Sequence, residues 1–243
     1  MTAILDGKNH IAINTFDPSG KAIFTGEAHM NESGYPAAIS LSPDGEILGV
    51  AYWYVDAGVV KTDVAFYNFG DVGQNNNDCI VSAYSYTDLL IPYIHFINNK
   101  TSFAVADGRL ILYSGNHIPV EQTTKLFDEE VQSVFYGDKY IALVYRSDDS
   151  EYFYRVDIYN SQTKNADNFF VKSVYTDISY DDIVLGDDTF IIYNDRECMI
   201  STYSGTEKFR GEFKKPVRLM IPLGKSYKYM LVTDDSVDTI QMK

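Results

Sequence analysis

The side chains that could perform nucleophilic chemistry are scattered along this chain. Serine hydrolysis needs a serine on a strained turn beside a histidine and an acid, and the sequence contains no Gly-x-Ser-x-Gly motif. Isolated histidines are more typical of ordinary strand or loop residues than of catalytic bases, and four are present: His10, His29, His95 and His117. We therefore expect no catalytic residues of this class.

Metal and nucleotide sites are not indicated by the sequence either. Calcium favours oxygen ligands at alternating positions before a glycine, and the acidic doublets lack that spacing, so we interpret them as solvated turn residues. Gly224-Lys225-Ser226 resembles the end of a P-loop, but Leu219 stands where the first glycine is required. We expect no metal and no cofactor. The doublets are Asp148-Asp149, Asp181-Asp182, Asp187-Asp188 and Asp234-Asp235.

The two cysteines, Cys79 and Cys198, form no CxxC pair and no zinc spacing. The sequence favours two part-buried thiols and does not determine whether they pair.

Charge restricts the partners of this chain. Twenty basic and 34 acidic residues give a net charge of −14 in 243 residues. This balance argues against nucleic acid, which needs clustered Lys and Arg, and against an anionic membrane surface. No run of 18 apolar residues occurs, so we expect no direct membrane insertion by this chain. The first seven residues have no basic start and do not form a signal peptide.

The elements that must position any site are short strands. Apolar runs of four to nine residues alternate with Gly, Asp, Asn and Ser turns, and 20 Tyr and 14 Phe favour strands further. One strand ending in an aromatic residue recurs at intervals of 51, 46, 46 and 44 residues, which is the length of a four-stranded propeller blade. The recurring aromatics are Phe16, Tyr67, Tyr113, Tyr159 and Tyr203.

The repeat predicts an all-β propeller of four-stranded antiparallel blades, with about five to six blades, in a single domain over residues 1–243. The expected units are a partial blade at 1–29, four blades at 35–86, 91–127, 131–173 and 181–213, and an incomplete blade at 216–242. Because an innermost strand is missing at the front, we expect that earlier blades precede Met1, and ring closure stays open.

Several segments carry a resemblance to known propellers. Ser33-Gly34-Tyr35-Pro36 followed by Ser40–Gly45 resembles the WD-like repeat of TolB-type propellers. Thr2–Asp6, the same Ser33–Pro36 stretch and Phe66–Asn75 resemble a domain-of-unknown-function family from Gram-positive anaerobes. That resemblance implies a membrane-anchored protein whose propeller lies outside the cytoplasm, at the cell surface. The resemblance covers nearly the whole chain, but the anchor helix and the first blades of the family are absent from this sequence. The family has no assigned catalytic residues, so the resemblance implies none here.

Two features are candidates for binding. The connection from Asn68 to Asp78 is long for a hairpin, and long loops on rigid scaffolds often bind ligands, so Asn68, Gln74 and Asn75 are candidates. A structural loop using asparagine in turns is the alternative. Trp53 lies in an aromatic run on a strand, where one face is core and the other can form an exposed patch.

The sequence thus favours a non-catalytic binding or scaffolding propeller with a protein or glycan partner. A carbohydrate-active propeller is the alternative, since acids and tyrosines can line a central funnel. The expected inner strands contain few acids, so catalytic carboxylates would have to come from loops, such as Asp177 or Asp181.

Overall fold

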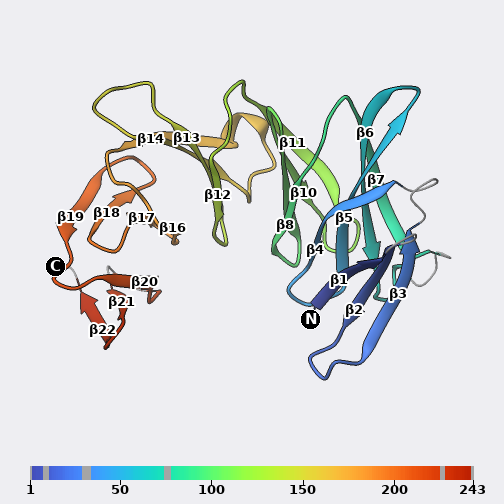
Figure 1. Cartoon of the computed structure of the whole chain (residues 1–243), viewed down its shortest axis with the longest axis horizontal. Helices are drawn as coiled ribbons and strands as arrows, with labels where there is room; N and C mark the ends of the chain where they lie inside the picture. The colour runs from blue at the N-terminus through green and yellow to red at the C-terminus, as the bar shows by residue number, and fades with distance from the viewer. Residues whose placement is uncertain (1, 8–10, 29–33, 74–77, 225–227, 242–243) are drawn as a thin grey trace. The chain divides into compact units, whose positions relative to one another are not determined.

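The computed structural model describes residues 2–7, 11–28, 34–73, 78–224 and 228–241. In this part, every regular element is a β-strand apart from a short 3-10 helix at Ala166–Asn168. The strands form six antiparallel sheets, each made of consecutive strands (Figure 1). The predicted all-β propeller architecture is confirmed.

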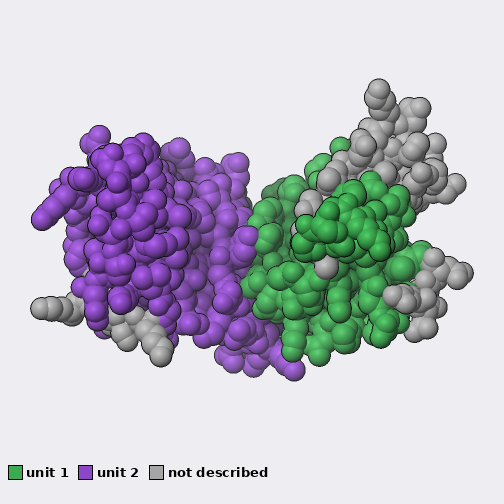
Figure 2. All heavy atoms as spheres, turned by 90° about the horizontal axis from the view of Figure 1, so that it is seen from below, with its two compact units in different colours: residues 1–128 green, residues 129–243 purple. Residues whose placement is uncertain are grey.

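Contacts divide the chain into two compact units, residues 1–128 and residues 129–243 (Figure 2). A single domain over the whole chain therefore stays a prediction, and each unit is described by itself.

Unit 1 contains three sheets. Sheet A comprises β1 (Thr2–Gly7), β2 (Ile11–Phe16) and β3 (Ala22–Ala28). Sheet B comprises β4 (Tyr35–Leu41), β5 (Ile47–Asp56), β6 (Val59–Asn68) and β7 (Ile80–Thr87). Sheet C comprises β8 (Tyr93–Asn98), β9 (Thr101–Ala106), β10 (Arg109–Ser114) and β11 (Val120–Leu126).

Unit 2 also contains three sheets. Sheet D comprises β12 (Ser133–Tyr136), β13 (Tyr140–Arg146), β14 (Tyr154–Asn160) and β15 (Phe170–Thr176). Sheet E comprises β16 (Asp182–Leu185), β17 (Thr189–Tyr193), β18 (Glu197–Thr202) and β19 (Glu207–Glu212). Sheet F comprises β20 (Val217–Pro222), β21 (Lys228–Thr233) and β22 (Val237–Gln241). The short consecutive strands that the sequence predicts are present.

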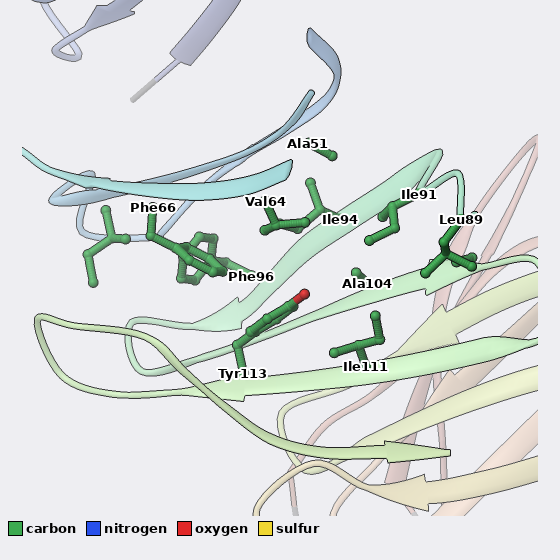
Figure 3. Packing of buried hydrophobic residues seen from close by; sticks show 12 residues of the cluster. Ala51, Val64, Phe66, Leu89, Ile91, Ile94, Phe96, Ala104, Ile111 and Tyr113 are labelled. Carbon is green, nitrogen blue, oxygen red and sulfur yellow. The ribbon is translucent and has the colours of Figure 1, made fainter. Parts of the chain in front are cut away.

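Within each unit, the hydrophobic core lies between successive sheets. Between sheets B and C, Val64 and Phe66 of β6 face Ile94 and Phe96 of β8, with Tyr113 beside them (Figure 3). On the opposite side of sheet B, Leu48, Val50 and Tyr52 of β5 pack toward sheet A. Because alternate residues of a strand point to opposite faces, a strand covered on both faces is apolar throughout. This explains the unbroken apolar stretch at the start of β5.

The turn between the first two strands of sheet B has the predicted chemistry. Gly45 has φ +77°, and the carboxylate of Asp44 accepts hydrogen bonds from the Ser42 hydroxyl and the Glu46 N–H. The Ser42 hydroxyl also accepts the Ile47 N–H at 2.9 Å. The Ser-Pro-Asp-Gly sequence therefore closes the hairpin through its own side chains.

The aromatic repeat coincides with a repeated irregularity in the sheets. Where the third strand pairs with the fourth, the register shifts at Phe66/Tyr67, Leu112/Tyr113 and Ile158/Tyr159. Such bulges bend and twist a strand. Two of these tyrosines also form a hydrogen bond with a second tyrosine hydroxyl. The hydroxyl oxygens are 2.7 Å apart in Tyr67–Tyr52 and 2.7 Å apart in Tyr113–Tyr86. The sequence period therefore marks bulge positions as well as strand ends.

Candidate binding surface around Trp53

Trp53 is anchored at the end of sheet B by a hydrogen bond to the backbone. It lies on β5, opposite Tyr35 of β4 and Thr62 of β6. Directly opposed residues of antiparallel strands share a face, so these three side chains lie in one row. The Trp53 indole N–H donates to the Ile91 carbonyl at 3.0 Å, and the indole is half-buried. One part of the ring is therefore fixed, and another part reaches solvent.

The segment that follows β7 is held against this row. The buried Thr62 hydroxyl donates to the Leu89 carbonyl at 2.6 Å. Leu89 and Ile91 are both buried in the core between sheets B and C. Leu90, between them, is 40% exposed. Leu90 is therefore the exposed residue of a segment that Thr62 and Trp53 hold on either side of it.

Tyr35 depends on the glycine that precedes it. Gly34 has φ +83°, and a Cβ built on it would lie 2.7 Å from the Trp53 carbonyl oxygen. A residue with a side chain would be strained there twice, by its backbone conformation and by this contact. Gly34 thus allows the chain to approach β5 closely, and Tyr35 begins β4 with half of its surface exposed.

The hairpin between β5 and β6 completes the surface. Ala57 and Gly58 both have positive φ, 51° and 81°, which is the geometry of a two-residue type I′ turn. This turn joins Asp56, the last residue of β5, to Val59, the first residue of β6. Val55 is 68% exposed and Val59 38%. Val59 is paired with Asp56 and lies on the face opposite to Trp53 and Val55. We call the residues Tyr35, Trp53, Val55 and Leu90 the Trp53 surface.

The charge at the tip of this hairpin is paired. The Lys61 ammonium lies 2.6 Å from the Asp56 carboxylate. Its hydrogen bond holds the pKa of Asp56 below the usual range. In the hairpin register, Asp56 and Lys61 lie on the face opposite to Trp53 and Val55. The residues of the Trp53 surface are themselves apolar or aromatic, so they can offer a ligand apolar contact area.

The candidate residues of the long loop are placed differently. The Asn68 side chain is fully buried, and its amide donates to the His117 carbonyl at 3.0 Å while its oxygen accepts the Gly70 N–H at 2.8 Å. Gly73 is packed so closely on the Asn68 backbone that a Cβ would collide with the Asn68 carbonyl oxygen. Asn68 therefore organises the base of the loop. Gln74 and Asn75 lie outside the described residues.

The loop carboxylates considered for glycoside hydrolysis have structural partners. Asp177 lies 2.7 Å from the Arg210 guanidinium, whose hydrogen bond lowers the pKa of that carboxyl. Asp181 accepts the Asp195 N–H at 3.1 Å. A glycosidase acid needs a raised pKa, and Asp177 is shifted in the opposite direction. The described part of the chain brings no group of three His, Cys, Asp or Glu side chains into a metal-binding arrangement.

Unit 2 contains an apolar cavity of about 410 Å³ between sheets E and F. Phe209, Phe213, Leu231 and Ile240 contribute to its wall, and the buried Cys198 lies at its base. Both cysteines are free thiols. Burial raises the pKa of the Cys198 thiol to about 11, so this thiol is protonated and unreactive at neutral pH.

Sequence reasoning selected Trp53 but missed Tyr35, Val55 and Leu90. The Ala57-Gly58 turn is a weak signal for a hairpin tip, and a Gly before an aromatic residue is a weak signal for a close backbone approach. No described helix is long and apolar enough to cross a bilayer.

Several solved structures are similar to this chain, and the one with a TM-score above 0.5 supports the propeller architecture. The WD40 domain of Pan2 from Neurospora crassa matches 98% of this chain and 73% of its own, at 11% identity and a TM-score of 0.52. Hsv2 from Kluyveromyces lactis matches 86% of this chain and 60% of its own, at 11% identity and a TM-score of 0.47. A HIRA fragment matches 72% and 56%, at 10% identity and a TM-score of 0.48. The chain thus spans less than two thirds of the last two.

No curated protein matches this sequence. A family model described as "Family of unknown function (DUF5711)" matches residues 1–242. This match agrees with the domain-of-unknown-function resemblance carried by Thr2–Asp6 and Phe66–Asn75, and the chain belongs to the DUF5711 family.

Proposed function

We propose that this protein is a non-catalytic binding or scaffolding propeller that holds a partner protein at the Trp53 surface. The observation that carries the proposal is an apolar, aromatic group of exposed side chains on a backbone that is fixed by hydrogen bonds. Exposed apolar groups of this kind are typical of protein interfaces when they are contiguous, and aromatic anchors supply much of the binding energy. The fold provides rigidity, and the site provides the function.

We further propose that this binding takes place outside the cytoplasm, at the cell surface. The topology implied by the family resemblance supports this placement. Labelling intact cells with a membrane-impermeant maleimide tests it through an introduced Val55→Cys thiol. Labelling of Val55→Cys in intact cells supports an external propeller, whereas labelling only after lysis contradicts it.

Site-specific cross-linking tests the binding function directly. A photo-reactive residue at Val55, which is 68% exposed, is compared with the same residue at Leu126, which is 64% exposed on β11. We expect a discrete cross-linked partner protein at Val55 and none at Leu126. Equal cross-linking at both positions, or none at Val55, would contradict the proposal.

Intrinsic fluorescence gives a second readout, because Trp53 is the single tryptophan of the chain. Addition of the cross-linked partner in purified form should change the indole emission. Tyr35→Ala should weaken that binding, and Tyr136→Ala, at a comparably exposed tyrosine of unit 2, should not. Glycan binding or hydrolysis that is lost with Tyr35→Ala would instead establish the carbohydrate-active alternative.

A further inference from the structure

A second aromatic surface lies in unit 2, at the end of sheet D. Phe153 is 59% exposed, and Tyr175 on β15 is 47% exposed. The ring of Tyr152 lies 5.7 Å from that of Tyr175, measured between centroids. Phe153 is joined to the same strand because its N–H donates to the Thr176 carbonyl at 2.9 Å. We call Tyr152, Phe153 and Tyr175 the acid-rimmed surface, for the reason given below.

The loop between β13 and β14 presents these rings in a fixed conformation. The Ser147 N–H donates to the Phe153 carbonyl at 3.1 Å and closes the loop. Inside the loop, the Asp149 N–H donates to the Ser147 hydroxyl, and the Glu151 N–H donates to the Asp149 carboxylate at 2.9 Å. The position of the surface is therefore determined by the loop itself, which lowers the entropic cost of binding.

The same loop carries three exposed carboxylates, those of Asp148, Asp149 and Glu151. None of them has a basic partner in the part of the chain that the structure describes. Arg146, the last residue of β13, is the one basic residue from Tyr140 to Phe153. Arg155, on the neighbouring strand, is already engaged at 2.8 Å by Glu129 and at 3.1 Å by Asp157. The aromatic rings are thus bordered by uncompensated negative charge.

This combination selects a class of ligand. The face of an aromatic ring attracts a cation within about 6 Å, and Arg is the most frequent protein partner. Unit 2 itself contains such a pair, because the Arg155 guanidinium lies 4.6 Å above the centre of the Tyr145 ring. Carboxylates at the border add charge-assisted hydrogen bonds to the same cation. Phosphate, nucleic acid and acidic peptides are repelled by the same border.

We propose that the acid-rimmed surface binds a Lys- or Arg-containing segment of a partner protein. The proposal is independent of the Trp53 surface, which offers no such charge. The rings receive the cationic head groups and their methylene stems, and the loop carboxylates pair with those head groups at the border.

Binding of labelled peptides to the full chain tests the proposal by fluorescence anisotropy. The probes are a twelve-residue peptide with four arginines spaced by Gly and Ser, and the same peptide with four glutamates. We expect the arginine peptide to bind and the glutamate peptide not to bind. Phe153→Ala and Tyr175→Ala should each weaken the arginine peptide about two- to fivefold, the range of an exposed cation–π contact.

A matched charge control separates this site from the general attraction of a chain of charge −14. The triple variant Asp148→Asn, Asp149→Asn, Glu151→Gln removes three charges from the loop. The triple variant Asp107→Asn, Asp138→Asn, Asp188→Asn removes three exposed charges elsewhere. The loop variant should weaken binding at least tenfold, and the control by less than twofold. Circular dichroism melting checks that both variants are folded.

Three outcomes would overturn the proposal. Equal losses in the two triple variants would show that only net charge matters. Unchanged affinity after Phe153→Ala and Tyr175→Ala would remove the aromatic contribution. Sedimentation that shows self-association abolished by the loop variant would assign the surface to a second copy of the chain.

Discussion

The Trp53 surface and the acid-rimmed surface occupy equivalent hairpins of two sheets, one in each unit, and differ in what the hairpin contains. In sheet B a two-residue turn, Ala57-Gly58, joins two long strands, and its Asp56 is paired with Lys61. In sheet D a longer loop leaves Asp148, Asp149 and Glu151 without a basic partner among the described residues. Loop length thus determines whether a blade of this chain presents apolar contact area or contact area bordered by charge.

The foundations of the two surfaces differ as well. Trp53 and Thr62 are held by neutral hydrogen bonds to backbone carbonyls. Beneath the acid-rimmed surface, Arg155 binds Asp157, whose carboxylate is buried and also accepts the Ser173 hydroxyl at 2.6 Å. Substitutions should therefore lower the free energy of unfolding for different reasons. In unit 2 a buried carboxylate loses its cation, and in unit 1 a single neutral hydrogen bond is lost.

The largest loss of stability is expected when the Arg155–Asp157 ion pair is broken. Arg155→Met leaves the buried Asp157 carboxylate without its cation, and breaking a buried pair in this way costs about 3 kcal/mol. Urea unfolding of the full chain, followed by circular dichroism, measures the loss. Arg146→Met, at an exposed arginine of the same sheet, is the control and should change stability little. Equal stability of the two variants would show that the pair contributes nothing.

A smaller effect is expected at the glycine that positions Tyr35. Gly34→Ala places a side chain at φ +83° and against the Trp53 carbonyl, at a cost of about 2 kcal/mol. Gly58→Ala has nearly the same φ, +81°, with open space around its Cβ, and should cost about 1 kcal/mol. Chemical unfolding, followed through Trp53 fluorescence, measures the free energy of unfolding of both variants. Identical losses would mean that strain alone, and not the close approach, makes Gly34 necessary.

Removing the neutral hydrogen bond between Thr62 and Leu89 should cost less stability. Thr62→Val keeps the shape of the side chain but leaves the buried Leu89 carbonyl without its donor, a loss of about 1–2 kcal/mol. The same substitution at the exposed Thr239 is the control. Hydrogen exchange at residues 89–91 should rise in Thr62→Val, and unchanged exchange would argue against the proposed attachment of this segment.

The smallest effect concerns the phenol pair Tyr52–Tyr67, on the other face of sheet B. Burial raises the pKa of both hydroxyls, so the pair stabilises the fold fully below about pH 10, the pKa of an unfolded tyrosine, and this contribution is lost as the pH rises further. Tyr67→Phe should therefore cost about 1 kcal/mol at pH 7. The difference from the native chain should shrink above pH 10, and a difference that does not change with pH would contradict this account.

The sequence predicts much of this fold because its signals are local. The Tyr113 and Tyr159 repeat follows strand ends, and Ser42–Gly45 carries the whole chemistry of its turn. The sequence does not predict the two-residue turn at Ala57-Gly58, because Ala rarely adopts positive φ.

The candidate sites were harder to predict, because exposure is decided by packing between sheets. Trp53 could be recognised as an anchor from its residue type, but nothing local distinguishes the exposed Leu90 from the buried Leu89 and Ile91. Asn68 has the composition of an exposed loop amide, and its side chain is instead buried against the backbone near His117. Phe153 follows an acidic run in the sequence, and only the fold places Tyr175 beside it.

The position of the single tryptophan has a consequence for measuring how cooperatively the chain unfolds. Trp53 lies in unit 1, so its emission follows that unit alone, whereas circular dichroism follows strands of both units. Coincident transitions by different probes are the mark of two-state unfolding. Comparison of the two signals in one denaturant series therefore distinguishes one cooperative transition from two independent ones.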